Sequence, residues 1–228
     1  MEYLNSKQMA RVDKKAIEKG LSPLQLMENV GSNVANFISN LKPRPEKVII
    51  IFGKGNNGAD GLATARHLVV KGIKVELIPA SEEINENTKK QLAFLKNIGI
   101  NPKKDLRVNG GELIIDSLLG YSIKGDPRGR YKELIESINY IHKKGNSVLS
   151  LDLPSGLDPN TGKEGNPTIN PDYTLTFGLP KKGLKGMKNV FLVNLGIPSQ
   201  VYKESGLEHG NYFMEKDVIK LTNTKIKN

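Results

Sequence analysis

The sequence predicts a single α/β domain of three layers, α/β/α, with a mostly parallel central sheet and an N-terminal helical pair. From residue 46 onward, short apolar runs alternate with stretches of helical length, which is typical of parallel strands joined by right-handed helical crossovers. No repeat, low-complexity tract or Ser/Pro-rich linker interrupts the 228 residues. One domain is therefore expected over 1–228, with its core at about 3–220 and a polar, lysine-rich tail after it.

The elements follow from periodicity and from residues typical of helix starts. Apolar residues recur at helical spacing over 3–19 and 23–40, and Ser22 with Pro23 has the residue types of an N-cap and a first helical position. Apolar runs predict strands at 48–52, 75–79, 113–116, 148–153, 173–177 and 190–195. The crossover helices are expected at 60–71, 87–97 and 131–144.

Composition excludes several kinds of site. The absence of cysteine removes disulfides, thiolate catalysis and cysteine-ligated metal, and the scattered positions of His67, His142 and His209 argue against zinc. The first residues lack the pattern of a secretory signal, and no run approaches the ~20 apolar residues that span a bilayer. We therefore expect a cytoplasmic protein with no membrane partner.

The formal charge of +10 raises nucleic-acid binding as an alternative. The lysines are dispersed along the chain, as on solvated faces, which favours a role in solubility and does not indicate a nucleic-acid partner. The densest cluster could instead hold an anionic small molecule; it consists of Lys181, Lys182, Lys185 and Lys188.

A glycine-rich segment, 53–61, lies between the first predicted strand and the following helix. Its four glycines permit positive φ and close approach of backbone N–H groups, and a helix N-terminus carries partial positive charge, so we predict a phosphate-cradling turn. The segment is neither a Walker A motif nor the GxGxxG fingerprint. The alternative is a connector in which Asp60 caps the helix.

Two aspartates follow other predicted strands. Asp116 could bind a cation or a ligand, or simply cap its loop. Asp152 lies in an apolar segment where partial burial would suit it to proton transfer, which makes it a candidate general acid or base; the alternative is a structural aspartate. Because ligands bind at the carboxyl ends of parallel strands, we expect the three polar turns to converge at one edge of the sheet.

Together these turns resemble the motifs of the NAD(P)H-hydrate epimerase family, the YjeF N-terminal domain family, in its stand-alone form. The matching segments are Gly-x-Gly-Asn-Asn-Gly-x-Asp-Gly-Leu from Gly53, the run from Asp116 to Gly120, and Asp-Leu-Pro-Ser-Gly from Asp152. The similarity spans about 3–200 in the family's order, and it implies a Rossmann-like fold. Ala59, Tyr121, Ser122 and Leu153 depart from the commonest family pattern, and Ala59 could tighten the turn.

The resemblance implies an enzyme that interconverts the R and S epimers at C6 of hydrated NADH and NADPH, a repair step completed by a separate dehydratase. It also implies that Asp152 is catalytic, that Asn57, Asp116 and Ser155 hold a potassium ion, and that the protein is a homodimer. Oxygen donors of this kind suit a hard cation. The implied substrate-binding residues are Asn56, Asn57, Gly58, Ala59, Asp60, Gly120, Tyr121, Ser122, Ile123, Lys124, Gly125, Asp126 and Asp152.

A non-catalytic scaffold of the same fold, binding RNA or protein, is the competing interpretation. The basic charge favours it slightly. The joint presence of Asn57, Asp116, Asp152 and Ser155 argues against it, because a scaffold has no chemical need for that set.

Overall fold

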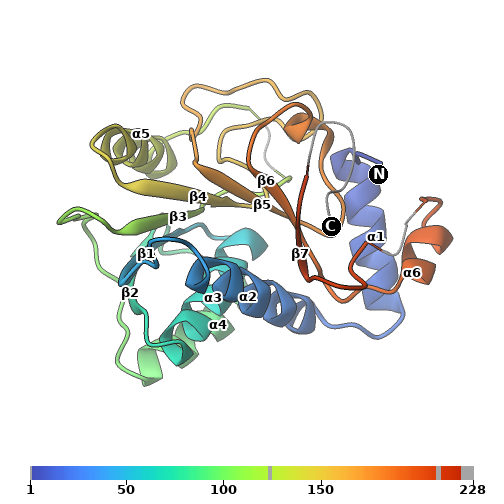
Figure 1. Ribbon diagram of the computed structural model, residues 1–228, viewed down its shortest axis with the longest axis horizontal. Coiled ribbons are helices and arrows are strands. Elements are labelled where there is room, and N and C mark those ends of the chain that lie inside the picture. Colours follow the sequence, from blue (N-terminus) through green and yellow to red (C-terminus); the bar gives the residue numbers. More distant parts are fainter. Residues whose placement is uncertain (1, 123–124, 209–211, 222–228) are drawn as a thin grey trace.

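The computed structural model describes residues 2–122, 125–208 and 212–221, and their strands form one twisted sheet (Figure 1). The strand order is β2-β1-β3-β4-β5-β6-β7, with parallel pairing throughout except between β6 and β7. The bounds are β1 Lys47–Phe52, β2 Lys74–Pro79, β3 Leu113–Ser117, β4 Ser147–Leu151, β5 Tyr173–Phe177, β6 Val190–Val193 and β7 Val218–Lys220. The mostly parallel sheet predicted from the sequence is confirmed.

Helices cover both faces of this sheet. Their bounds are α1 Ser6–Glu18, α2 Pro23–Ser39, α3 Asn56–Val70, α4 Glu86–Asn97, α5 Arg130–Lys143 and α6 Ser199–Glu204, with a short 3₁₀ turn at Lys182–Leu184. Figure 1 shows α5 on one side of the sheet and α2, α3 and α4 on the other. None of the helices in the described ranges is long and apolar enough to cross a membrane.

Alternation of side chains along the strands divides the core between the two faces. Val48 and Ile50 of β1 belong to the large apolar cluster shared with α1, α2 and α3, whereas Ile49 and Ile51 pack in the cluster formed with α5. Successive residues of a strand point to opposite faces, and strands covered on both faces are apolar at every position. This explains why the first strand reads as an unbroken apolar run.

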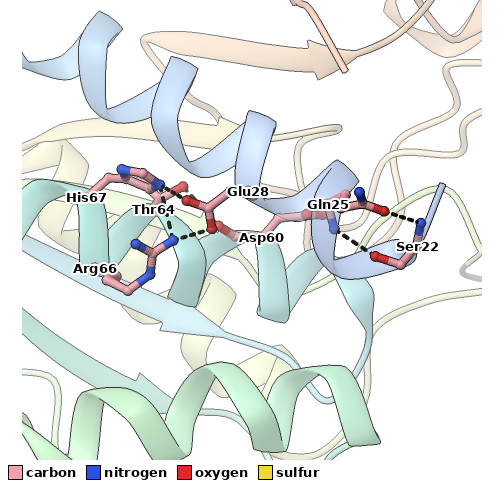
Figure 2. Close-up of polar contacts among 7 residues, drawn as sticks. All are labelled: Ser22, Gln25, Glu28, Asp60, Thr64, Arg66 and His67. Carbon is pink, nitrogen blue, oxygen red and sulfur yellow. Dashed lines mark hydrogen bonds and ion pairs between the residues drawn. The ribbon is translucent and has the colours of Figure 1, made fainter. Parts of the chain in front are cut away.

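The second N-terminal helix begins at Pro23 as predicted, the first begins at Ser6, three residues after its predicted start, and each packs on a different partner. Ser22 is the N-cap of α2: its Oγ accepts from Gln25 N at 3.2 Å, and Gln25 Oε1 accepts from Ser22 N at 2.7 Å (Figure 2). The α2 helix packs along α3, while α1 packs against α6. The predicted pair is thus two separately docked helices.

Helix α3 begins at Asn56, four residues before the predicted start, with Gly55 as its N-cap. The alternative in which Asp60 caps this helix is therefore wrong, because Asp60 lies in its second turn. The glycines of segment 53–61 do not use the positive φ that glycine permits. They serve close packing instead: a Cβ atom on Gly53 would overlap Leu118 O, and one on Gly61 would overlap the Ser117 side chain.

Candidate active site

A cavity of about 550 Å³ opens at the carboxyl ends of the strands. It lies where β1 is flanked by β2 on one side and β3 on the other, so the chain reverses its direction of progress across the sheet at this point. Ligands of open α/β sheets bind at such switch points. One wall comes from α1 and α2 and is apolar; it is formed by Met9, Ile17, Leu26, Met27 and Val30.

The opposite wall collects most of the residues singled out in the sequence. Those that line the cavity are Asn56, Asn57, Asp60, Gly120, Tyr121, Ser122 and Asp152. Gly58 and Ala59 lie behind the surface, where Ala59 packs against Met27 and Ala63. The predicted residues Ile123 and Lys124 lie outside the described ranges.

Gly125 and Asp126 do not line this cavity. The Asp126 carboxylate instead accepts from Asn166 N at 3.1 Å.

The turn at Gly120 lies between the turns that carry Asn57 and Asp152, since a Cβ atom on Gly120 would lie 3.4 Å from Asn57 Cβ and 3.6 Å from Asp152 Oδ2. The three polar turns therefore converge, as their positions after parallel strands predict.

Asp152 occupies a strained turn directly after β4. Its φ is +65°, and Leu153 N donates to Leu151 O at 2.8 Å across it, so Asp152 is the central residue of a γ-turn. A left-handed conformation is uncommon for residues other than glycine, and such strain gathers at functional sites. The turn ends β4 at Leu151, two residues before the predicted end, and only 4% of Asp152 stays exposed.

Lys181 is the main site residue whose role the sequence analysis missed, since the sequence indicated it only as one of a cluster of lysines. Only 1% of it is exposed, and its ammonium pairs with Asp152 Oδ1. It also donates to Phe177 O at 3.0 Å and to Thr176 Oγ1 at 3.3 Å. The N-terminal segment holds this lysine in place, because Leu4 N donates to Pro180 O at 2.8 Å and Lys182 N to Leu4 O at 2.8 Å.

The basic cluster predicted around Lys181 is thus divided. Lys182, Lys185 and Lys188 are exposed and do not line the cavity, whereas Lys181 lies inside it. The sequence offers one weak signal for this difference, namely that Lys181 comes first after the apolar run of β5 and its following turn.

Other titratable groups gather at the same cavity. Asp13 of α1 accepts a hydrogen bond of 2.6 Å from Tyr121 Oη, and burial raises the pKa of the Asp13 carboxyl. Burial and the neighbouring Asp13 carboxylate raise the pKa of the Tyr121 hydroxyl. Nothing in the local sequence pattern of this amphipathic helix marks Asp13 as a site residue.

Asp116 and Ser155 lie beneath the cavity and are almost fully buried. Asp116 Oδ1 accepts from Ser155 Oγ at 2.6 Å and Oδ2 from Ser150 Oγ at 2.8 Å, with Ser155 N and Leu118 N as further donors. Burial raises the pKa of Asp116, although these hydrogen bonds lower it.

Asn57 is linked to Ser155, and so to Asp116, through the backbone of Leu119. Its Nδ2 donates to Leu119 O at 3.0 Å, while Leu119 N donates to Ser155 Oγ at 3.0 Å. Asn57 Oδ1 is buried and accepts no hydrogen bond from any described residue. A buried amide oxygen without a donor is a costly arrangement that a bound cation would relieve, so this donor set suits a hard cation.

The cavity mouth is polar and lies over the N-terminus of α3. Asn85 Nδ2 donates to Asn56 Oδ1 at 2.8 Å, and Lys54 N donates to Tyr131 Oη at 3.0 Å. Arg66 is not part of this mouth. Figure 2 shows that Arg66 and His67 both meet the Glu28 carboxylate, which ties α3 to α2.

These features define a class: a Rossmann-like α/β domain with a helix N-terminus, an apolar wall and an ion-paired carboxylate around one ligand cavity. Residues 23–183 match the family described as YjeF-related protein N-terminus, and the chain belongs to this family. The crystal structure of a yeast protein, YNL200c, has the same fold: it is 25% identical, with a TM-score of 0.83 over 97% of this chain and 100% of that one.

Curated relatives include two proteins named NAD(P)H-hydrate epimerase. The one from Dehalogenimonas lykanthroporepellens is 35% identical over 88% of this chain and 84% of its own length. The one from Rhodopirellula baltica is 31% identical, over 88% of this chain and 87% of its own length. A bifunctional NAD(P)H-hydrate repair enzyme, Nnr, from Methanopyrus kandleri is 32% identical over 86% of this chain, which spans only 42% of that protein.

Proposed function

We propose that this chain is an epimerase that interconverts the R and S forms of hydrated NADH and NADPH at C6. The relatives named NAD(P)H-hydrate epimerase, which match over most of both chains, support the activity. The observation that carries the proposal is the position of the Asp152 carboxylate, paired with Lys181, in a cavity that also contains the N-terminus of α3. A proton-transfer group thus lies beside a place suited to an anion.

The cavity has the size and lining that a nucleotide requires. Its volume of about 550 Å³ falls in the range usual for ligand sites. We place the phosphates of the substrate over Asn56 and the first turn of α3, where backbone N–H groups and the helix dipole favour negative charge. The apolar side chains of α1 and α2 would cover the rings of the ligand.

The chemistry needs a proton donor and a proton acceptor, with no change in oxidation state. In our proposal, the C6 hydroxyl is protonated and leaves as water, and the planar cation that remains is hydrated from the opposite face. Asp152 moves a proton at the C6 hydroxyl in this sequence. A positioned carboxyl group can contribute about 10²–10⁴-fold to such a step.

We also propose that a potassium ion is held by Asn57, Asp116 and Ser155. The buried Asn57 Oδ1 without a donor supports this, and so does the carboxylate of Asp116 beneath it. When bound, the ion would supply positive charge at the base of the cavity and would fix the turns that carry these residues. Gly58, Ala59 and the segment Gly125–Asp126 contribute, in this proposal, by shaping the adjoining backbone.

The family resemblance also suggests a partner enzyme, a cellular compartment and an oligomeric state. We propose that a dehydratase acts on the epimer that this enzyme forms, that the enzyme works as a cytoplasmic homodimer, and that residues 1–228 act as one domain. Sedimentation of the purified protein over a range of concentrations would test the dimer.

The deciding experiment follows epimer-resolved hydrated NADPH by chromatography after incubation with the purified protein, with and without potassium. Conversion of the R form to the S form, accelerated over a protein-free control, is the expected result. No acceleration under either condition would overturn the proposed function.

A further inference from the structure

Asp60 differs from the other acids at this edge of the sheet in that its carboxyl group has no partner. Asp152 pairs with Lys181, and Asp13 accepts from Tyr121 Oη. Within the described ranges, no side chain or backbone amide donates to the Asp60 carboxyl and no cation pairs with it.

Figure 2 shows Asp60 on α3, where Thr64 Oγ1 donates to the Asp60 backbone carbonyl at 2.9 Å and leaves the side chain free. The buried carboxyl group of Asp116, by contrast, accepts four hydrogen bonds. A partly desolvated carboxyl group without a donor is costly to maintain.

The free carboxyl group shares its cavity with Asp152. Asp60 follows Asn57 by three residues, so both lie on the same face of α3 and both line the cavity. Asn57 in turn approaches Asp152 across Gly120. Asp60 and Asp152 therefore border one ligand volume, the first from α3 and the second from the end of β4.

The surroundings of Asp60 favour its protonated form. Part of its surface is open to the cavity, yet burial raises the pKa of Asp60 well above the ordinary carboxyl range. The negative charges of Asp152 and Asp13 raise the pKa of Asp60 further, and the ammonium of Lys181 opposes them. Tyr121 also lines this cavity, and the pKa of its hydroxyl is raised, partly by the charge of Asp60, which favours the neutral form of Tyr121.

We propose that Asp60 is a second catalytic residue of this site, the proton donor that works opposite the Asp152 carboxylate. The inference rests on the proposed epimerase function. The Asp60 proton passes to the C6 hydroxyl oxygen as the C6–O bond breaks. The electron pair of that bond leaves with the oxygen, which departs as water. Two carboxyl groups held in different protonation states are a recurrent way of combining acid and base catalysis.

The second half of the step restores the bond. A water molecule forms the new C6–O bond on the opposite face of the planar cation, and its proton passes to Asp152. Asp60 is then a carboxylate and Asp152 an acid, which is the arrangement that drives the reverse epimerisation. Water that enters the emptied cavity returns the proton from Asp152 to Asp60, so protons and electrons balance over one turnover.

The test compares Asp60→Asn with wild type and with Asp105→Asn, which changes an exposed acid that does not line the cavity. We expect kcat of Asp60→Asn to fall about 10²–10⁴-fold with KM changed little, because the amide keeps the shape but cannot donate a proton in this way. Asp105→Asn should match wild type. An Asp60→Asn variant with wild-type kcat would overturn the inference.

Two measurements on wild type guard against a folding defect in the variant. The rate should decline as rising pH removes the Asp60 proton, and infrared spectroscopy should find the carbonyl band of a protonated carboxyl group at neutral pH, lost in Asp60→Asn. A pH profile without that decline, or absence of the band, contradicts the inference.

Failure of the inference and failure of the proposed function remain distinguishable. If wild type does not epimerise hydrated NADPH, the function fails whatever the state of Asp60. If wild type does so and Asp60→Asn does so equally well, only the role of Asp60 fails.

Discussion

Lys181 and Asp152 form an ion pair from which solvent is almost excluded, with 1% and 6% of their side-chain surfaces exposed. Asp152 follows β4 directly, and the neighbouring strand β5 supplies Thr176 Oγ1 and Phe177 O as two further acceptors for the ammonium. Each buried charge is therefore compensated by the other. Removing one partner of a buried pair leaves an uncompensated charge, whereas removing both does not.

We therefore predict strong energetic coupling between the two residues. Lys181→Met and Asp152→Asn should each lower the free energy of unfolding by about 3–5 kcal/mol, and the double variant by clearly less than their sum. Urea denaturation of all four proteins measures the cycle. Lys182→Met, at the exposed neighbouring lysine, is the control and should stay within about 0.5 kcal/mol of wild type. Additive losses would contradict the coupling.

The γ-turn at Asp152 predicts how substitutions there rank in stability. Asp152→Gly should be more stable than Asp152→Ala by about 1 kcal/mol, because the left-handed φ of +65° strains alanine but not glycine. Both lack the carboxylate, so the comparison isolates the backbone. Thermal unfolding measures the difference, and equal stabilities would show that the turn relaxes at no cost.

The glycines around the cavity predict a steric contrast between near neighbours. Gly53→Ala should destabilise the protein by about 1–3 kcal/mol, because its Cβ atom would overlap Leu118 O on the adjacent turn. Gly55→Ala should cost less, since no atom lies within 4 Å of its added Cβ and its φ of −98° suits any residue. Chemical denaturation of both variants tests this order, and the reverse order would refute it.

A bound cation at Asn57 predicts stabilisation that is specific to potassium. The melting temperature of wild type should rise with potassium chloride more than with tetramethylammonium chloride at equal ionic strength, because a ligand of the native state adds RT ln(1 + [L]/Kd). Asn57→Ala should lose that difference, since it removes the buried oxygen without a donor. Asn101→Ala, at an exposed amide, should keep it. An identical salt response in wild type and Asn57→Ala would exclude this site.

Asp60 also predicts a dependence of stability on pH. The pKa of Asp60 is raised in the folded state. The contribution of Asp60 to the free energy of unfolding is therefore fully present below the unfolded pKa of about 3.9, and it is lost as pH rises through the folded pKa. Asp60→Asn should therefore gain stability over wild type with increasing pH. Melting temperatures measured from about pH 4 to pH 8 test the sign. Asp13 and Asp116 act in the same direction, so part of the slope should persist.

Periodicity was sufficient to predict most of the fold. The six parallel strands were expected from apolar runs that the structure places in one sheet, and Ser22 was recognised as the N-cap of α2 because Pro23 follows it as a first helical residue. The strand β7 was not expected as part of the sheet, because three residues are too few for a pattern. The end of β4 was misplaced, since the turn at Asp152 depends on contacts outside the local sequence.

What the sequence by itself determined is the family, the order of the elements and the three polar turns, because residues that follow parallel strands must meet at one edge of the sheet. What only the tertiary structure decided is the electrostatic state of the site. Lys181 resembles its neighbours in sequence, and Asp60 resembles a helix cap. Their burial beside Asp152 and Asp13 depends on the docking of α1 and of the segment after β5, and long-range packing of that kind leaves no periodic trace in the sequence.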